Sequence, residues 1–241
     1  MPYAVMDTPL PAETVVLPRR GWQIDPRHAA LAGAACWIGF ALITWLVHSG
    51  RTGAFDDAGL RLFRRNGDLA LMGSTAWAEA VRDTTALGGV VLRTIVSIAA
   101  FTALFFLRLR REAVLMAVTI LTGLVVELTI KELVGRPRPN LVPHLTDAAG
   151  MSFPSGHSFN SALGFIAIAL AFATYSVRRR VRWTLIGSAM VLSILVAFSR
   201  VLLGVHYPSD VIAGWLGGAG WAFLAEAAFY RPAKALAEAV P

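Results

Sequence analysis

Three short polar clusters in the second half of the chain carry residue types that could bind an anion and transfer a group. The first contains Lys131, Arg136 and Arg138 and follows a long apolar stretch. Arginine offers planar, bidentate donors to an oxyanion, and lysine adds a compact positive charge. Alone, such a cluster is more typical of basic side chains that reach from the end of a membrane span toward lipid headgroups. Its meaning therefore depends on the other two clusters.

The second cluster is Phe153-Pro154-Ser155-Gly156-His157, directly before an uncharged apolar run. The pattern predicts the start of a helix, where free backbone N–H groups and the helix dipole favour an anion. Gly156 would let the backbone approach the bound group closely. His157 would project from the first turn beside that anion, whereas an isolated histidine here would be interpreted as a helix cap.

The third cluster holds Ser199, Arg200, His206 and Asp210. An arginine inside an apolar run is costly unless it meets an anion or a carboxylate. Pro208 argues against one helix through His206 and Asp210, so we expect a turn with Pro208 starting the next helix. A carboxylate bonded to one imidazole nitrogen fixes the tautomer and makes the other nitrogen a better nucleophile. A purely structural hydrogen bond between His206 and Asp210 is the alternative.

A metal centre is a rival interpretation, because His157, His206 and Asp210 could together ligate an ion. Three fixed cations, Lys131, Arg138 and Arg200, would repel a divalent metal and already supply its charge. We therefore expect neither a metal nor another cofactor.

The rest of the chain predicts membrane spans that would carry these clusters. Of its 241 residues, 56% are hydrophobic and 15% are charged. An apolar run of about 20 residues can cross a bilayer as a helix. Six runs approach this length: Ala29–Val47, Gly88–Leu107, Ala113–Ile130, Ser158–Val177, Trp183–Val205 and Val211–Tyr230. We expect an all-α integral membrane protein with six transmembrane helices and the active site at the outer ends of spans three to six; a signal peptide is a weaker interpretation of the first run.

Basic residues near the span ends predict that both termini face the cytoplasm and that the three clusters face outward. The net charge of +7 then indicates contact with anionic lipid headgroups rather than nucleic acid. Cys36, the one cysteine, falls within the first span and cannot form an intrachain disulfide. We expect location in a bacterial inner or plasma membrane, and the sequence leaves the oligomeric state open.

The expected organisation is one membrane domain between two cytoplasmic tails. Residues 1–28 form the N-terminal tail, 29–230 the six-helix domain, and 231–241 the C-terminal tail. Within the domain, residues 49–87 form an extracytoplasmic loop. Two segments of this loop, Phe55–Arg65 and Leu69–Val81, suit short interfacial helices that would cover the site, although a solvated connector fits as well.

With their spacing, the three clusters resemble the type-2 phosphatidic-acid phosphatase superfamily, which includes vanadium haloperoxidases and the glucose-6-phosphatase type. Its signatures are Lys-x6-Arg-Pro, Pro-Ser-Gly-His and Ser-Arg-x5-His-x3-Asp. Here they are matched by Lys131 to Arg138-Pro139, by Pro154 to His157, and by Ser199-Arg200 to Asp210, with no departure. The resemblance covers about 113–230.

The resemblance implies a role for each matched residue. His206 would attack phosphorus, Asp210 would orient His206, and His157 would protonate the leaving oxygen and later activate water. The phosphate oxygens would be held by Lys131, Arg138, Ser155, Gly156 and Arg200. Arg136 and Ser199 are less defined contributors.

The expected function is hydrolysis of a phosphomonoester or diphosphate on a membrane lipid through a phosphohistidine, without a metal. Undecaprenyl diphosphate, phosphatidylglycerol phosphate, phosphatidic acid and a phosphate of lipid A are all compatible substrates, because the motifs recognise only phosphate. The alternative is a carrier that binds phosphate lipids without turnover; haloperoxidase chemistry fits poorly with six spans. Glu127 could orient Lys131 or be merely structural, and Arg93 could meet a headgroup or extend to the surface.

Overall fold

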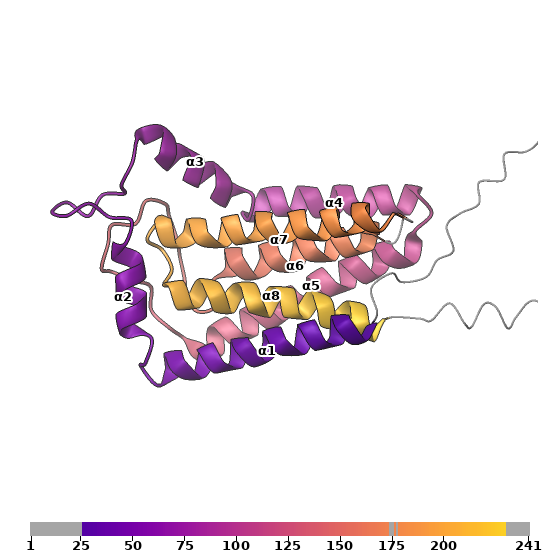
Figure 1. Ribbon diagram of the computed structural model, residues 1–241, viewed down its shortest axis with the longest axis horizontal. Coiled ribbons are helices and arrows are strands. Elements are labelled where there is room, and N and C mark those ends of the chain that lie inside the picture. Colours follow the sequence, from indigo (N-terminus) through magenta and orange to yellow (C-terminus); the bar gives the residue numbers. More distant parts are fainter. Residues whose placement is uncertain (1–25, 174–175, 177, 230–241) are drawn as a thin grey trace, which may run out of the picture.

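A computed structural model describes residues 26–173, 176 and 178–229. The expected tails therefore lie outside the described residues, except that 26–28 begin the first helix. The described chain is helical, and its only β-type pairing is an isolated bridge between Arg64 and Leu71. The helices, shown in Figure 1, are α1 (Pro26–His48), α2 (Gly53–Arg61), α3 (Thr75–Ala86), α4 (Val90–Phe106), α5 (Arg110–Val134), α6 (Gly156–Ala173), α7 (Arg179–Leu202) and α8 (Pro208–Ala228).

The helices confirm the expected all-α membrane fold. Among the described residues, α1, α5, α6, α7 and α8 are each long and apolar enough to cross a membrane. A sixth span results if α3 and α4, which meet at a bend of 49°, count as one. Large hydrophobic side chains that stay exposed, such as Ile38, Ile95, Leu121 and Val191, lie on these helices. In a membrane such side chains would contact lipid.

Two short helices lie within residues 49–87, but their bounds differ from those expected: α2 ends at Arg61 rather than Arg65, and the second helix begins later. Residues 69–74 form a turn instead, and α3 begins at Thr75. Leu69 and Gly73 have φ values of +53° and +107°, which a helix cannot accommodate. Ser74 then caps α3 by accepting a hydrogen bond from the Trp77 N–H.

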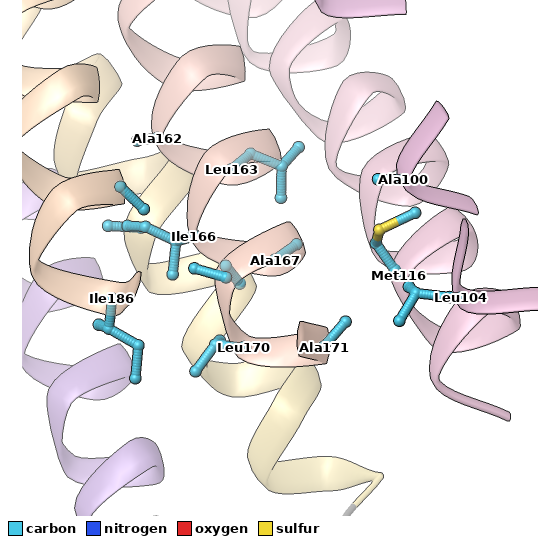
Figure 2. Packing of buried hydrophobic residues seen from close by; sticks show 14 of the residues in the cluster. Ala100, Leu104, Met116, Ala162, Leu163, Ile166, Ala167, Leu170, Ala171 and Ile186 are labelled. Carbon is cyan, nitrogen blue, oxygen red and sulfur yellow. The ribbon is translucent and has the colours of Figure 1, made fainter. Parts of the chain in front are cut away.

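Helix α6 forms the centre of the bundle and contacts α4, α5, α7 and α8. Most of its side chains are buried, whichever face they occupy. Figure 2 shows Ile166 on the side of α6 toward Ile186 of α7, while Leu163 points toward the side on which Met116 of α5 lies. A helix that is apolar all round can be buried in this way.

Glycines let α8 pack closely against α6. A Cβ atom at Gly218 would lie 2.0 Å from the carbonyl oxygen of Phe159, and one at Gly214 would lie 2.7 Å from that of Ser155. Small residues at membrane helix contacts permit this close backbone approach. The contact brings the N-terminus of α6 beside the N-terminus of α8, where the Ser155 N–H donates to the Asp210 carbonyl at 3.1 Å.

The polar segments gather at one end of the bundle. In Figure 1, α1 begins and α8 ends at the same end, and α2 lies at the opposite one. The connection from α5 to α6 is held at the α2 end, because Arg136 pairs with Asp56 and the Leu145 N–H donates to the Leu203 carbonyl. Sequence-distant polar residues therefore converge there.

Candidate active site

The three polar clusters meet at the α2 end of the bundle. Helix α5 ends at Val134 and is capped by Gly135, which adopts a left-handed conformation with φ of +59° and donates its N–H to the Lys131 carbonyl. The chain then turns back across the bundle end, where the Ser152 N–H donates to the Arg136 carbonyl at 2.7 Å. This return places the first two clusters beside the α7–α8 turn.

His206 lies in that turn, between α7 and α8, and only 2% of its surface is exposed. Arg138 approaches it: a guanidinium nitrogen lies 3.0 Å from His206 Nε2 and also donates to the Val205 carbonyl at 2.9 Å. Further hydrogen bonds to the carbonyls of Ala149 and Gly150 fix the Arg138 guanidinium. The Nε2 face of His206 is thus the cationic face.

The opposite nitrogen of His206 faces Asp210. Nδ1 lies 3.6 Å from Asp210 Oδ2, at ion-pair rather than hydrogen-bond distance. That carboxylate oxygen accepts hydrogen bonds from the Ser152 hydroxyl and, at 3.0 Å, from the Tyr207 N–H at the start of α8. Asp210 therefore caps its own helix while it faces the imidazole.

Burial lowers the pKa of His206 to about 4; the Asp210 carboxylate opposes this shift, and the charges of Arg138 and Arg200 add to it. Since a lowered histidine pKa favours the neutral form, His206 is uncharged at neutral pH. A neutral imidazole keeps the lone pair that a nucleophile needs, and Arg138 faces that lone pair on Nε2 until a phosphate oxygen binds the guanidinium. The environment is therefore suited to nucleophilic attack by His206.

His157 stands on the first turn of α6, as predicted, and the bend between α3 and α4 covers it. A Cβ atom at Gly88 would lie 3.3 Å from His157 Cδ2. Arg200 also reaches this bend, because its guanidinium donates to the Thr85 hydroxyl at 2.9 Å. Among the described residues, the buried Arg200 Nε has no hydrogen-bond partner. Arg200 thus retains a donor for a bound anion.

Lys131 closes the site from the α5 side. Its Nζ lies 2.8 Å from Glu127 Oε1, one helical turn earlier. A Cβ atom at Gly156 would lie 3.0 Å from that carboxylate oxygen and 3.2 Å from Lys131 Nζ. The ion pair therefore lies against the start of α6, and Gly156 gives the room for it. Ser155, fully buried beside Gly156, accepts a hydrogen bond from the Ser158 hydroxyl at 2.9 Å.

Arg136 takes a different position from the one its sequence neighbours suggest. The sequence groups it with Lys131 and Arg138 as an anion ligand, but its guanidinium binds the carboxylates of Asp210 at 2.6 Å and Asp56 at 2.8 Å. It also lies 4.1 Å from the centre of the Tyr207 ring. Two carboxylates occupy its donors, so Arg136 supports Asp210 rather than contributing a free cation. Ser199 likewise turns away, donating to the Val196 carbonyl.

Asp56 is a charged residue of the site that the sequence analysis did not single out, as it did not single out the hydroxyls of Ser152, Thr85 and Ser209. It lies on α2, is fully buried, and accepts hydrogen bonds from the Ser209 N–H at 2.9 Å and the Ser209 hydroxyl at 2.8 Å. Helix α2 fits tightly here, since a Cβ atom at Gly59 would lie 2.4 Å from Pro208. In the sequence, Asp56 is one of several acids in an arginine-rich loop, and only the pairing with Arg136 distinguishes it.

The described residues contain no group of three or more histidine, cysteine, aspartate or glutamate side chains arranged to hold a metal. Of the eight predicted site residues, the structure brings His206, Asp210 and Arg138 into direct contact. Lys131 lies at Gly156, and Ser155 bonds to the Asp210 backbone. His157 and Arg200 lie beneath the α3–α4 bend and interact electrostatically with each other. The eight residues therefore form one cluster at the α2 end of the bundle.

Asp56→Asn should destabilise the protein, because it leaves the partly buried Arg136 with one anionic partner and weakens the bonds to Ser209. We expect a loss of about 1–3 kcal/mol in the free energy of unfolding, the usual cost of losing hydrogen bonds to a buried charge. Thermal melting in detergent would measure it. The matched control is Asp57→Asn, since Asp57 is the exposed neighbour on α2; equal melting of both variants would contradict the role given to Asp56.

Known proteins similar to this chain are phosphatases of membrane lipids by name. A lipid A 1-phosphatase of Rhizobium etli is 35% identical over 138 residues, which cover 54% of each chain. Phosphatidylglycerophosphatase B of Bacillus subtilis is 34% identical over 116 residues, 46% of this chain and 55% of that one. An undecaprenyl-diphosphatase of Sulfolobus acidocaldarius is 32% identical over 129 residues, covering 50% and 57%. The chain thus spans about half the length of the curated relatives it matches.

The similarity to a solved structure extends over most of the fold. The crystal structure of a transmembrane PAP2 type phosphatidylglycerolphosphate phosphatase from Bacillus subtilis superimposes with a TM-score of 0.72 at 25% identity. The match covers 87% of this chain and 97% of that one. It therefore includes helices outside the three motifs.

The model of the PAP2 superfamily matches residues 111–233, which is just over half of the chain and contains every motif residue from Lys131 to Asp210. The resemblance inferred from the three signatures is confirmed, and the chain belongs to the PAP2 superfamily.

Proposed function

We propose that this chain is a membrane phosphatase that hydrolyses a lipid phosphate or diphosphate through a phosphohistidine formed on His206. The observation that carries the proposal is the placement of a neutral, buried His206 between Asp210 on one nitrogen and Arg138 on the other. The similar proteins support the substrate class, because they are named as phosphatases of lipid A, phosphatidylglycerophosphate and undecaprenyl diphosphate.

In this proposal the cations hold the phosphoryl group in line with His206. Arg138 would bind an oxygen beside Nε2, and Arg200 would use its unpaired Nε. Lys131, the Ser155 hydroxyl and the backbone N–H groups of the first turn of α6, from Gly156 onward, would bind the remaining oxygens. Fixed cations and dipoles stabilise the charge spread over the equatorial oxygens in the transition state.

The reaction then has two balanced steps. His206 Nε2 donates its lone pair to phosphorus, the bond from phosphorus to the lipid oxygen breaks, and His157 gives that oxygen a proton. Water next attacks the phosphohistidine, His157 takes its proton, and the phosphorus–nitrogen bond breaks to release phosphate. Asp210 would stabilise the positive imidazolium that carries the phosphoryl group. A bound phosphate places negative charge beside His157 and so favours its protonated form.

A binding protein without turnover is the second candidate. It would keep the cations but would not need a histidine at each side of the phosphate. The site contains both His206, with Asp210 beside it, and His157. This pair of histidines favours an enzyme over a binding protein. The lipid itself stays open among undecaprenyl diphosphate, phosphatidylglycerol phosphate, phosphatidic acid and lipid A phosphate.

His206→Ala should abolish phosphate release by purified protein in detergent, with a chelator present, from a panel of these four lipids. Loss of a nucleophile should cost more than about a thousandfold in kcat. His157→Ala should cost about a hundredfold or more, as expected for loss of an acid and base. The matched control is His48→Ala at the exposed end of α1. If the His206 variant turned over at the wild-type rate, the assignment of the nucleophile would be wrong.

We also propose that the site faces the extracytoplasmic side, with the termini in the cytoplasm. The proposal is supported by the basic residues that flank the other bundle end, such as Arg108, Arg110 and Arg180.

A cysteine placed at Asn66, in the α2–α3 loop, tests this orientation in a Cys36→Ser background. A membrane-impermeant maleimide should label Asn66→Cys in intact spheroplasts. It should label the control Arg180→Cys, at the start of α7, only after permeabilisation. The reverse pattern would mean that the orientation is inverted.

A further inference from the structure

A cavity of about 300 Å³ lies between α4 and α5, with Asn160 of α6 in its wall. Its lining changes along α4: Arg93, Thr94 and Ser97 are polar, whereas Phe101 is apolar. Arg93 and Phe101 are eight residues apart, about 12 Å along a helix axis. The cavity thus runs from a polar end into the apolar layer of the bundle.

The polar end of this cavity is close to the candidate active site. Helix α4 begins just after Gly88, which packs against His157. Asn160 follows His157 by one turn on α6. Arg93 also interacts electrostatically with both His157 and Glu127, the partner of Lys131. A molecule bound at the phosphate site could therefore extend directly into the cavity.

Arg93 lacks a protein partner that would explain its place within a membrane span. Within the described part of the chain, neither a salt bridge nor a hydrogen bond of its guanidinium is present; the nearby Glu127 is paired with Lys131. A charged side chain inside a membrane normally marks an ion pair or a substrate path. The Arg93 side chain is half-buried, and it lines the cavity.

The proposed reaction puts the leaving group on the side where Arg93 lies. His206 attacks from one side of phosphorus, and His157 protonates the oxygen that departs from the other. Arg93 lies in the first turn of α4, just after Gly88, which packs against His157, so its charge acts near the departing oxygen and its substituent. In a polyprenyl diphosphate this substituent is a second phosphate, whereas in a polyprenyl monophosphate it is a neutral carbon chain.

We propose that Arg93 binds the phosphate that stays on the lipid when a lipid diphosphate is hydrolysed, and that the cavity between α4 and α5 holds the adjoining hydrocarbon chain. This inference rests on the proposed function and adds a substrate preference to it. His206 attacks the terminal phosphorus, the bond from that phosphorus to the bridging oxygen breaks, and the lipid monophosphate leaves along Arg93 with a proton from His157. Water then cleaves the phosphohistidine and releases inorganic phosphate. A polyprenyl monophosphate would use the same histidines but would gain nothing from Arg93.

The first test compares a polyprenyl diphosphate with the polyprenyl monophosphate of equal chain length. Arg93→Gln should lower kcat/KM for the diphosphate by roughly 10- to 100-fold, the usual effect of losing a hydrogen bond to a charged group. For the monophosphate the loss should stay below about threefold, because no such bond is lost. Arg93→Lys should retain part of the preference, since it keeps the charge but not the bidentate geometry. Arg61→Gln, at an exposed position of α2, is the matched control.

A second variant tests the cavity by itself. Ala117→Phe places a large side chain in the cavity wall and should lower kcat/KM for the long-chain diphosphate while sparing a short-chain diphosphate. The control Ala99→Phe lies on an exposed face of α4 that does not line the cavity.

The outcomes separate this inference from the proposed function. Equal losses on diphosphate and monophosphate in Arg93→Gln, or no loss on either, would overturn the inference while leaving the phosphatase intact. If Ala117→Phe lowered kcat/KM equally for the long-chain and the short-chain diphosphate, the cavity would not be the site of the hydrocarbon chain. If the wild-type protein released phosphate from other lipids of the panel but not from the polyprenyl diphosphate, only the inference would fail; release from none of the lipids would sink the proposed function itself.

Discussion

The arrangement of the site depends on compensating positive charge at the end of a helical membrane bundle. Cations taken out of water are costly unless anions lie close by. Asp56 and Asp210 neutralise Arg136, and Glu127 neutralises Lys131. Arg138 is held by carbonyl oxygens instead, and Arg200 by Thr85, so both remain electrostatically available for a phosphate. The carboxylates thus allow a cationic site to form without neutralising all of it.

The packing of the helices determines where that charge is placed. Close contact between α6 and α8, made possible by Gly214 and Gly218, puts the start of α6 beside the start of α8. His157 and Asp210 are positioned by those two helix starts, and His206 by the tight turn between α7 and α8. Helix α2 then holds the α8 start through Asp56 and Ser209. A rigid apolar bundle therefore supports the polar end.

The sequence predicts the spans well, because apolar length is a local signal, and its motif spacing selects eight residues that the fold brings to one end of the bundle. It predicts less well what each basic residue meets. Arg136 and Arg138 are two positions apart, yet one binds carboxylates and the other approaches His206, which depends on how the 135–155 segment returns across the bundle. Asp56 is 154 positions from Asp210, and no local pattern connects them. The late start of α3 reflects turn conformations at Leu69 and Gly73 that hydrophobic pattern alone does not reveal.

The central claim is that His206 carries the phosphoryl group between lipid and water. The stereochemical course at phosphorus tests it most directly, using a lipid phosphorothioate made chiral with oxygen isotopes. Two successive in-line displacements, one by His206 and one by water, predict overall retention of configuration. Inversion would show a single displacement by water and would contradict the account.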